Sequence, residues 1–291
     1  MAQARRLAQP GPVAAERIIS AVGRLATLDF TLEPGQTLNA AIAGPLLRAG
    51  LTAAQVELSG GAFGPFTYVM PAAAPDDTHA AWYSAPFTPA GASPLEAGCL
   101  SFGHRDGAPF VHCHAVWREA DGGRHGGHVM PLESVVAAPI LARAYGTADI
   151  ALTTEYDAET NFTLFTPRVL RAPGPGPRIA FARVRPNTDI SAALVDLCRR
   201  HGFAAGRVRG SIGSLIGARF ADAPDLPDHA TELFVRHGRI APGADGVLAA
   251  ELDIALVGLS GALAQGRLAG ENPVCITFEL AVEEVAPPAI A

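Results

Sequence analysis

Three histidines, His112, His114 and His128, stand at spacings that suit a metal ion. Residues two apart on a β-strand share a face, so His112 and His114 are expected to point the same way. A chain reversal near Asp121 would set His128 opposite His114, because each lies seven residues from Asp121 (121 − 114 and 128 − 121). Three neutral imidazoles placed in this way suit a Zn²⁺ ion with one open position. The competing interpretation is three ordinary histidines on a solvated strand face.

A zinc-dependent hydrolase acting on a small molecule is an alternative use of the same residues. Three histidines and an open position can lower the pKa of a bound water to about 7. Such an enzyme needs a general base near the metal. The candidate carboxylates are Glu133, Glu155, Asp157 and Glu159. The sequence does not rank them, and each can also be read as a surface residue, so no catalytic residue is assigned.

The composition predicts a soluble, compact and oligomeric protein. The chain has 291 residues, enough for two domains with their own cores, with 49% hydrophobic and 17% charged residues. Its net charge is −6 and no Arg-rich block occurs, which argues against a nucleic-acid partner. No apolar stretch reaches the roughly 18 residues of a membrane span, and the first residues lack an export signal. The sequence therefore predicts a cytoplasmic protein without a membrane partner.

The spacing of the four cysteines is consistent with a cytoplasmic protein. No CxxC spacing occurs among Cys99, Cys113, Cys198 and Cys275. This spacing excludes a zinc ribbon and a redox pair, and it favours reduced thiols in a cytoplasm.

The chain repeats one pattern of strand, helix and glycine-rich turn, at residues 32–63 and again at 184–215. Aligning Leu38 with Ile190 gives a shift of 152 (190 − 38), and the same shift places Gly61 on Gly213 (213 − 61). Apolar residues at three- and four-residue spacing predict a helix in each copy, ended by Gly50 or Gly202. The candidate caps and turn residues before these helices are Gly35, Thr37, Asn187, Thr188 and Asp189.

Strands joined by tight turns are predicted after each helix. In the first copy they are residues 98–104, 110–117, 124–130 and 134–145; in the second they are residues 232–239, 248–257, 261–267 and 274–283. The expected fold class is α+β, as two tandem copies of a mostly antiparallel sheet packed with a helix. The Pro- and Gly-rich residues 171–177 are the expected linker, between a first module at residues 1–170 and a second at residues 178–291.

The second copy lacks the histidines. A shift of 139 (267 − 128) places Arg267 on His128, and it places Asp253 and Glu251 on the other two histidines. An ion-pair cluster of Glu251, Asp253 and Arg267 is the expected replacement for the metal site. The smaller shift leaves about thirteen extra residues in the first copy (152 − 139), within a Pro- and Ala-rich loop at residues 69–96 that could lie over the site.

The order of these motifs resembles the plant- and prokaryote-conserved (PPC or PCC) domain, also known as domain of unknown function 296. The resemblance covers residues 17–167 and 178–285. In the first copy it is carried by Pro34, Gly35, Gly61, His112, His114, Asp121, Gly122, Gly126, Gly127 and His128. In the second copy it is carried by Pro186, Gly210, Gly213, Gly238, Gly266 and Glu279. The HxH and GGH motifs are the specific part of this match.

The resemblance implies an α+β module that assembles as trimers, and a metal ion, zinc above all, on His112, His114 and His128. It also implies a family label of DNA binding, although this chain has no RGRP-type hook. A homo-oligomer, with a trimer favoured, and an unidentified small-molecule ligand are therefore the expected partners. The family's usual glutamate matches Glu279, but Ile140 stands in its place in the first copy. This substitution argues against a role for that carboxylate at the intact metal site.

Overall fold

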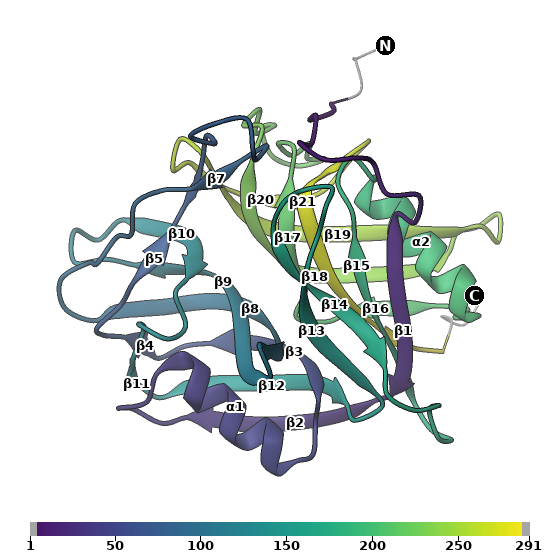
Figure 1. Ribbon diagram of the computed structural model, residues 1–291, viewed down its shortest axis with the longest axis horizontal. Helices are drawn as coiled ribbons and strands as arrows, with labels where there is room; N and C mark the ends of the chain where they lie inside the picture. Colours follow the sequence, from purple (N-terminus) through teal and green to yellow (C-terminus); the bar gives the residue numbers. More distant parts are fainter. Residues whose placement is uncertain (1–4, 287–291) are drawn as a thin grey trace.

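Two large β-sheets, each covered by one helix, make up most of the computed structural model, which describes residues 5–286 (Figure 1). The pairing between neighbouring strands is antiparallel apart from one bridge between β13 and β8. The predicted α+β class with two tandem sheet-and-helix units is confirmed. Neither described helix is long and apolar enough to cross a membrane.

The first sheet carries the histidines. Along its main path the strands run in the order β2 (Ala26–Leu32), β12 (Ile140–Thr147), β3 (Ala53–Ser59), β8 (Ser93–Arg105), β9 (Ala108–Arg118), β10 (Arg124–Val129) and β5 (Tyr68–Val69). Four further strands join beside this path: β4 (Ala62–Phe63), β11 (Val136–Ala138), β13 (Ile150–Tyr156) and β14 (Thr163–Val169). The long loop at residues 69–96 contains a small ribbon of β6 (Pro71–Ala72) and β7 (Trp82–Tyr83).

The second sheet belongs to the second copy except for its edge strand. Its order is β1 (Ile18–Arg24), β15 (Arg178–Val184), β21 (Val274–Glu284), β16 (Gly206–Val208), β18 (Thr231–Pro242), β19 (Leu248–Gly258) and β20 (Leu263–Arg267), with β17 (Ile212–Leu215) beside β18 and β21. Strand β1 comes from the N-terminal half of the chain and pairs with β15. Residues 171–177, where the sequence predicts a linker, follow the last strand of the first sheet. All strands of the second sheet come after them except β1.

The two helices, α1 (Leu38–Arg48) and α2 (Ile190–His201), begin and end as their sequences indicate. The side chains of Thr37 and Asp189 each accept a hydrogen bond from a backbone N–H in the first turn, which satisfies a donor that the helix leaves free. Gly50 and Gly202 follow in the left-handed region, at φ +72° and +67°. Both helix ends therefore confirm the predicted caps.

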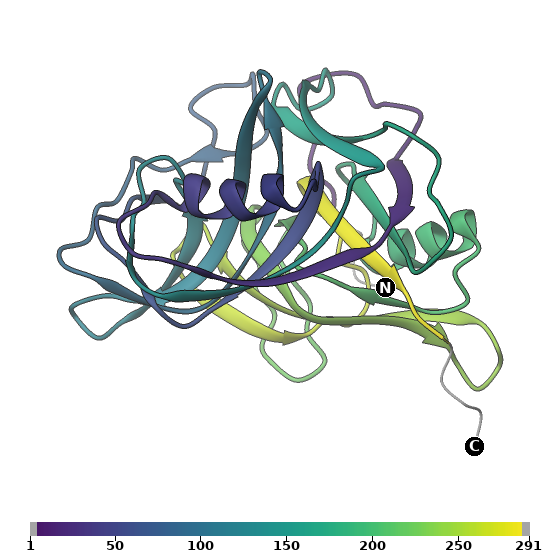
Figure 2. The same ribbon diagram turned by 90° about the horizontal axis from the view of Figure 1, so that it is seen from below.

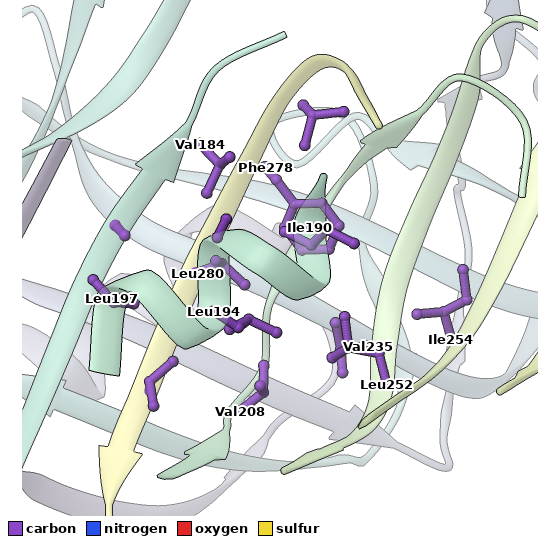
Figure 3. Packing of buried hydrophobic residues seen from close by; sticks show 14 of the residues in the cluster. Val184, Ile190, Leu194, Leu197, Val208, Val235, Leu252, Ile254, Phe278 and Leu280 are labelled. Carbon is purple, nitrogen blue, oxygen red and sulfur yellow. The ribbon is translucent and has the colours of Figure 1, made fainter. Parts of the chain in front are cut away.

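Each helix covers a core on one face of its sheet, and the two sheets meet on their other faces. Figure 3 shows Ile190, Leu194 and Leu197 of α2 against the second sheet, with Val235 and Leu280 among the residues below. The equivalent core of the first sheet lies under α1. A smaller apolar cluster joins the sheets: Cys99 and Val116 from β8 and β9, with Ile212, Phe234 and Ala255 from β17, β18 and β19. Figure 2 shows the two units side by side, each with its helix.

Gly213 shows how tightly β17 and β21 pack. A Cβ atom there would lie 2.6 Å from Cγ and 2.8 Å from Cα of Phe278, which is fully buried. The backbone atom cannot move cheaply, so we expect Gly213→Ala to lower the free energy of unfolding by about 1–3 kcal/mol in urea titrations. Gly174→Ala, where no atom lies within 4 Å, is the control and should change it by less than about 0.5 kcal/mol. Equal losses in the two variants would contradict this packing argument.

Candidate metal centre

The hairpin of β9 and β10 brings the three predicted histidines together. His114 and His128 are direct partners in its register, and the turn lies between the paired residues Arg118 and Arg124. The centroid of the His112 ring lies 4.7 Å from the centroid of the His114 ring and 4.7 Å from that of the His128 ring. The centroids of the His114 and His128 rings are 5.4 Å apart. One ligand atom from each ring lies within 4.8 Å of the others, so the three side chains could hold one metal ion.

The alternation of β9 separates the histidines from the helix core. Cys113 points into the core under α1, whereas His112 and His114 face the second sheet. His114 is 2% exposed and His112 and His128 are partly buried. His125 also lies on β10, but it is outside the cluster and approaches Glu119 and Asp121. The interpretation of solvated strand histidines is therefore wrong for this face.

The second sheet supplies the hydrogen-bond partners of the first sheet's histidines. Nδ1 of His114 lies 2.8 Å from the backbone carbonyl of Leu233 on β18, and because a carbonyl only accepts, Nδ1 carries the proton. Nδ1 of His112 lies 2.9 Å from Oε1 of Glu279 on β21, and it likewise donates to the carboxylate. In the neutral form of each ring, this arrangement leaves the lone pair on Nε2.

These two lone pairs point at each other. Nε2 of His112 and Nε2 of His114 are 3.0 Å apart. Two lone pairs cannot hydrogen-bond to each other, so this distance requires a cation between them, either a proton on one ring or a metal ion bound to both. Nδ1 of His128 is buried and lacks a hydrogen-bond partner among the described residues, which adds a further unused polar atom. Metal-binding histidines usually donate their other N–H to a carboxylate or carbonyl, as His112 and His114 do here. The residues present thus fit a metal ion.

Glu232 and Glu279 are the site residues that sequence reasoning missed or set aside. The sequence argued against a role for Glu279 at the metal site, because Ile140 stands in its place in the first copy. In the structure Glu279 reaches His112, because the second sheet packs against the histidine face. Oε2 of Glu232, on β18, lies 2.6 Å from Nε2 of His114. Ile140 itself is fully buried in the first core. The sequence contained Glu279 as a family match, but no local signal linked Glu232 to the histidines.

The surroundings shift the pKa values of the site in consistent directions. Burial lowers the pKa of His128 well below its ordinary value, and His112, His114 and Arg105 add to this, so the ring stays neutral. Burial would also lower the pKa of His114, but Glu232 and the carbonyl of Leu233 raise it on balance. The carboxylate thus favours the protonated, positively charged form of His114. Burial would raise the pKa of Glu279, but contact with His112 lowers it, so the group stays ionised.

Two small cavities of about 50 Å³ each flank the histidines. The first is lined by His112, His114 and Glu232 together with Trp82 and Tyr83. The second is lined by His112, His128 and Glu279, again with Tyr83. Since a water needs roughly 10–15 Å³ of such space, each cavity can hold only a few waters or a very small ligand. The long loop at residues 69–96 therefore covers the site, as the sequence suggested, with the Tyr83 ring 5.3 Å from that of His128.

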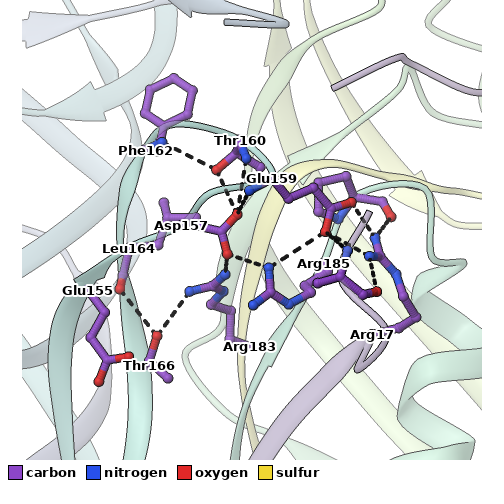
Figure 4. A network of polar contacts seen from close by, with 12 residues as sticks. Arg17, Glu155, Asp157, Glu159, Thr160, Phe162, Leu164, Thr166, Arg183 and Arg185 are labelled. Carbon is purple, nitrogen blue, oxygen red and sulfur yellow. Dashed lines mark hydrogen bonds and ion pairs between the residues drawn. The ribbon is translucent and has the colours of Figure 1, made fainter. Parts of the chain in front are cut away.

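The four predicted candidates for a general base lie elsewhere, and none of them lines either cavity. Glu133 is exposed, and Glu155 forms an ion pair with Arg168. Asp157 and Glu159 are buried, at 3% and 2% exposure, so their interpretation as surface residues is wrong. They form ion pairs with arginines of the β1 and β15 segments, because the β13–β14 hairpin packs there (Figure 4).

The second copy keeps the hairpin without the site. Asp253 pairs with Arg267 in the register of β19 and β20, which matches the pairing of His114 with His128. The predicted ion-pair cluster of these residues with Glu251 is wrong. Each side chain instead has its own partner: Arg236 for Asp253, Arg239 for Glu251 and Asp222 for Arg267. Arg236, Arg239 and Asp222 lie within ion-pair distance of these side chains, which explains the three separate pairs.

Several solved structures are similar to about half of this chain. A plant- and prokaryote-conserved (PPC) protein of Pyrococcus horikoshii is 17% identical, over 55% of this chain and 100% of its own, with a TM-score of 0.39. A metal-containing protein of Archaeoglobus fulgidus is 20% identical, over 50% of this chain and 94% of its own, with a TM-score of 0.38. A protein of Ralstonia eutropha JMP134, named as a candidate DNA-binding protein, is 14% identical, over 47% of this chain and 88% of its own, with a TM-score of 0.36.

No family model matches the chain, and no curated protein matches it. Each of the three structures matches about half of this chain and most or all of its own.

Proposed function

We propose that the chain binds one divalent transition-metal ion, zinc above all, through His112, His114 and His128. The observation that carries the proposal is the 3.0 Å approach of two Nε2 atoms whose partner nitrogens are already used as donors. A Zn²⁺ ion has the ligand preference and the charge to bind such lone pairs. Bound there, it would supply a positive charge and an acceptor for electron pairs inside a mostly buried site.

Metal analysis of the protein purified without chelators tests the proposal. We expect one zinc ion per chain in the wild type, measured by mass spectrometry of the metal content. The variant with all three histidines replaced by alanine should contain none, because no set of three donors remains. His125→Ala is the control and should keep its metal, since this histidine is outside the cluster. A metal-free wild type after addition of zinc, or a triple variant that retains zinc, would refute the proposal.

A hydrolytic role is the second candidate, and Glu232 is the observation that favours it. A carboxylate 2.6 Å from a ligand nitrogen, at the wall of a small cavity, could accept a proton from a bound water. The role requires that Glu232 be free rather than bound to the metal itself. The cavity volume of about 50 Å³ would restrict the substrate to a very small molecule.

Nucleic-acid binding is the weakest of the three interpretations. The name of the Ralstonia eutropha protein refers to DNA. This chain carries a net charge of −6, and its histidine face is buried against the second sheet. We therefore propose that the site serves a metal and not a nucleic acid.

A further inference from the structure

We infer that Glu232 of the second module is the fourth ligand of the metal ion held by the first module. The inference rests on the proposed metal site and goes beyond it in two ways. It closes the coordination of the ion, and it makes the ion a direct link between the two sheets. The histidines come from β9 and β10, whereas Glu232 comes from β18, more than 100 residues further along the chain.

The position of Glu232 favours a ligand over a distant base. Its Oε2 lies 2.6 Å from Nε2 of His114, which is the nitrogen that carries the free lone pair. At this distance the carboxylate and the ring nitrogen need a cation between them, which is a proton on Nε2 when the site is empty and would be the metal ion when it is bound. Glu279 differs, because it contacts the outer nitrogen of His112, which is already protonated. Glu279 therefore orients a ligand, while Glu232 reaches the ion's own position.

The charges around Glu232 support the same role. Its side chain is 12% exposed, and within residues 5–286 its only ion-pair or hydrogen-bond contact is with His114. Glu279 places a second carboxylate in the same enclosed space. Arg105 lines the cavity beside Glu279, but among residues 5–286 no arginine forms an ion pair with either carboxylate, and a buried anion is costly without a counter-charge. A divalent cation bound by Glu232 would neutralise both.

A site with three histidines and one glutamate has no open position. Four protein ligands are typical of zinc sites that stabilise a fold, whereas catalytic sites keep a place for water. The ion would thus hold β18 of the second module against β9 and β10 of the first. The apolar cluster of Cys99, Val116 and Phe234 lies at the same junction, so the metal and the core would act on the same interface.

Cobalt-substituted full-length protein tests this assignment. Co²⁺ reports its ligand set through visible absorption bands, and competition with a chromophoric chelator gives the zinc affinity. The test variant is Glu232→Gln, which keeps the shape but loses the charge. We expect altered bands and at least a roughly 10-fold weaker zinc affinity, by analogy with the 10–100-fold losses known for outer-shell residues. Glu284→Gln, whose side chain forms an ion pair with Arg178 away from the site, is the matched control and should behave as the wild type.

Hydrogen exchange gives a second readout. In the wild type, zinc should slow amide exchange in β9, β10 and β18. In Glu232→Gln it should slow exchange in β9 and β10 only, because the link to β18 is gone. If Glu232→Gln does not fold, Glu232→Asp replaces it: the carboxylate stays but is one methylene too short, so the affinity should still fall.

The two proposals fail in different ways. A wild type that binds no zinc would overturn the metal site itself. A Glu232→Gln variant with wild-type affinity, cobalt bands and zinc-dependent protection of β18 would overturn only the fourth ligand. That second result would leave the carboxylate free and would favour the hydrolytic role.

Discussion

Asp157→Asn is expected to lower the free energy of unfolding by about 3–5 kcal/mol, the range for removing one partner of a buried ion pair. Asp157 forms ion pairs with Arg183 and Arg185, and both Asp157 and Arg183 are 3% exposed (Figure 4). Burial and the charge of Arg185 lower the pKa of Arg183 to about 10. The amide keeps an acceptor for the backbone N–H of Thr160, so the loss reports the charge. Urea unfolding measures it.

An exposed ion pair provides the control for this prediction. Glu251 and Arg239 are also a carboxylate and an arginine 2.8 Å apart, but their side chains are 55% and 66% exposed. Because solvent screens such pairs, Glu251→Gln should cost less than about 1 kcal/mol. Replacing Asp157 and Arg183 together by Leu and Met should recover much of the loss, since no unpaired charge remains. If Asp157→Asn is as mild as Glu251→Gln, the network of Figure 4 does not stabilise the contact between the sheets.

The local parts of the fold could be predicted because their signals are local. Thr37 and Asp189 cap helices at the positions that the repeat indicated, and the left-handed Gly50 and Gly202 end them. The opposition of His114 and His128 follows from the strand period and the turn length alone. These features depend on neighbours within about a dozen residues, so a sequence displays them directly.

The contacts between the two copies could not be predicted in this way. Strand β1 pairs with β15, about 160 residues away. Nothing in the sequence of β1 shows that it joins the second sheet rather than the first. Glu232 and Glu279 reach the histidines only because the two sheets pack face to face. The histidine motifs of the first copy contain three ligands by themselves, so they give no indication that the second copy contributes to the site. A glutamate among apolar strand residues marks both positions as unusual, but nothing local links Glu232 to the histidines.

Withdrawal of the metal should destabilise the whole chain, which is the second large effect we expect. A ligand that binds only the folded state adds RT ln(1 + [L]/Kd), or about 4 kcal/mol at a free concentration 1,000 times Kd. At roughly 2–4 °C per kcal/mol for chains of this size class, a chelator should lower Tm by roughly 10 °C. The effect should be large because the histidines and Glu232 lie at the junction of the two sheets, where the metal ion would join β9 and β10 to β18. Differential scanning calorimetry with and without chelator measures it.

The number of thermal unfolding transitions tests whether the metal ion links the two sheets. If the ion links β18 to β9 and β10, the metal-bound protein should unfold in one transition, because neither sheet can open without releasing the ion. The metal-free protein keeps the apolar cluster and the Asp157 network, so it should remain folded at room temperature with a lower Tm. The variant with His112, His114 and His128 replaced by alanine should match the metal-free wild type and ignore the chelator. A wild-type Tm that does not change with chelator, in protein shown to contain zinc, would mean that the ion contributes nothing to the junction of the two sheets.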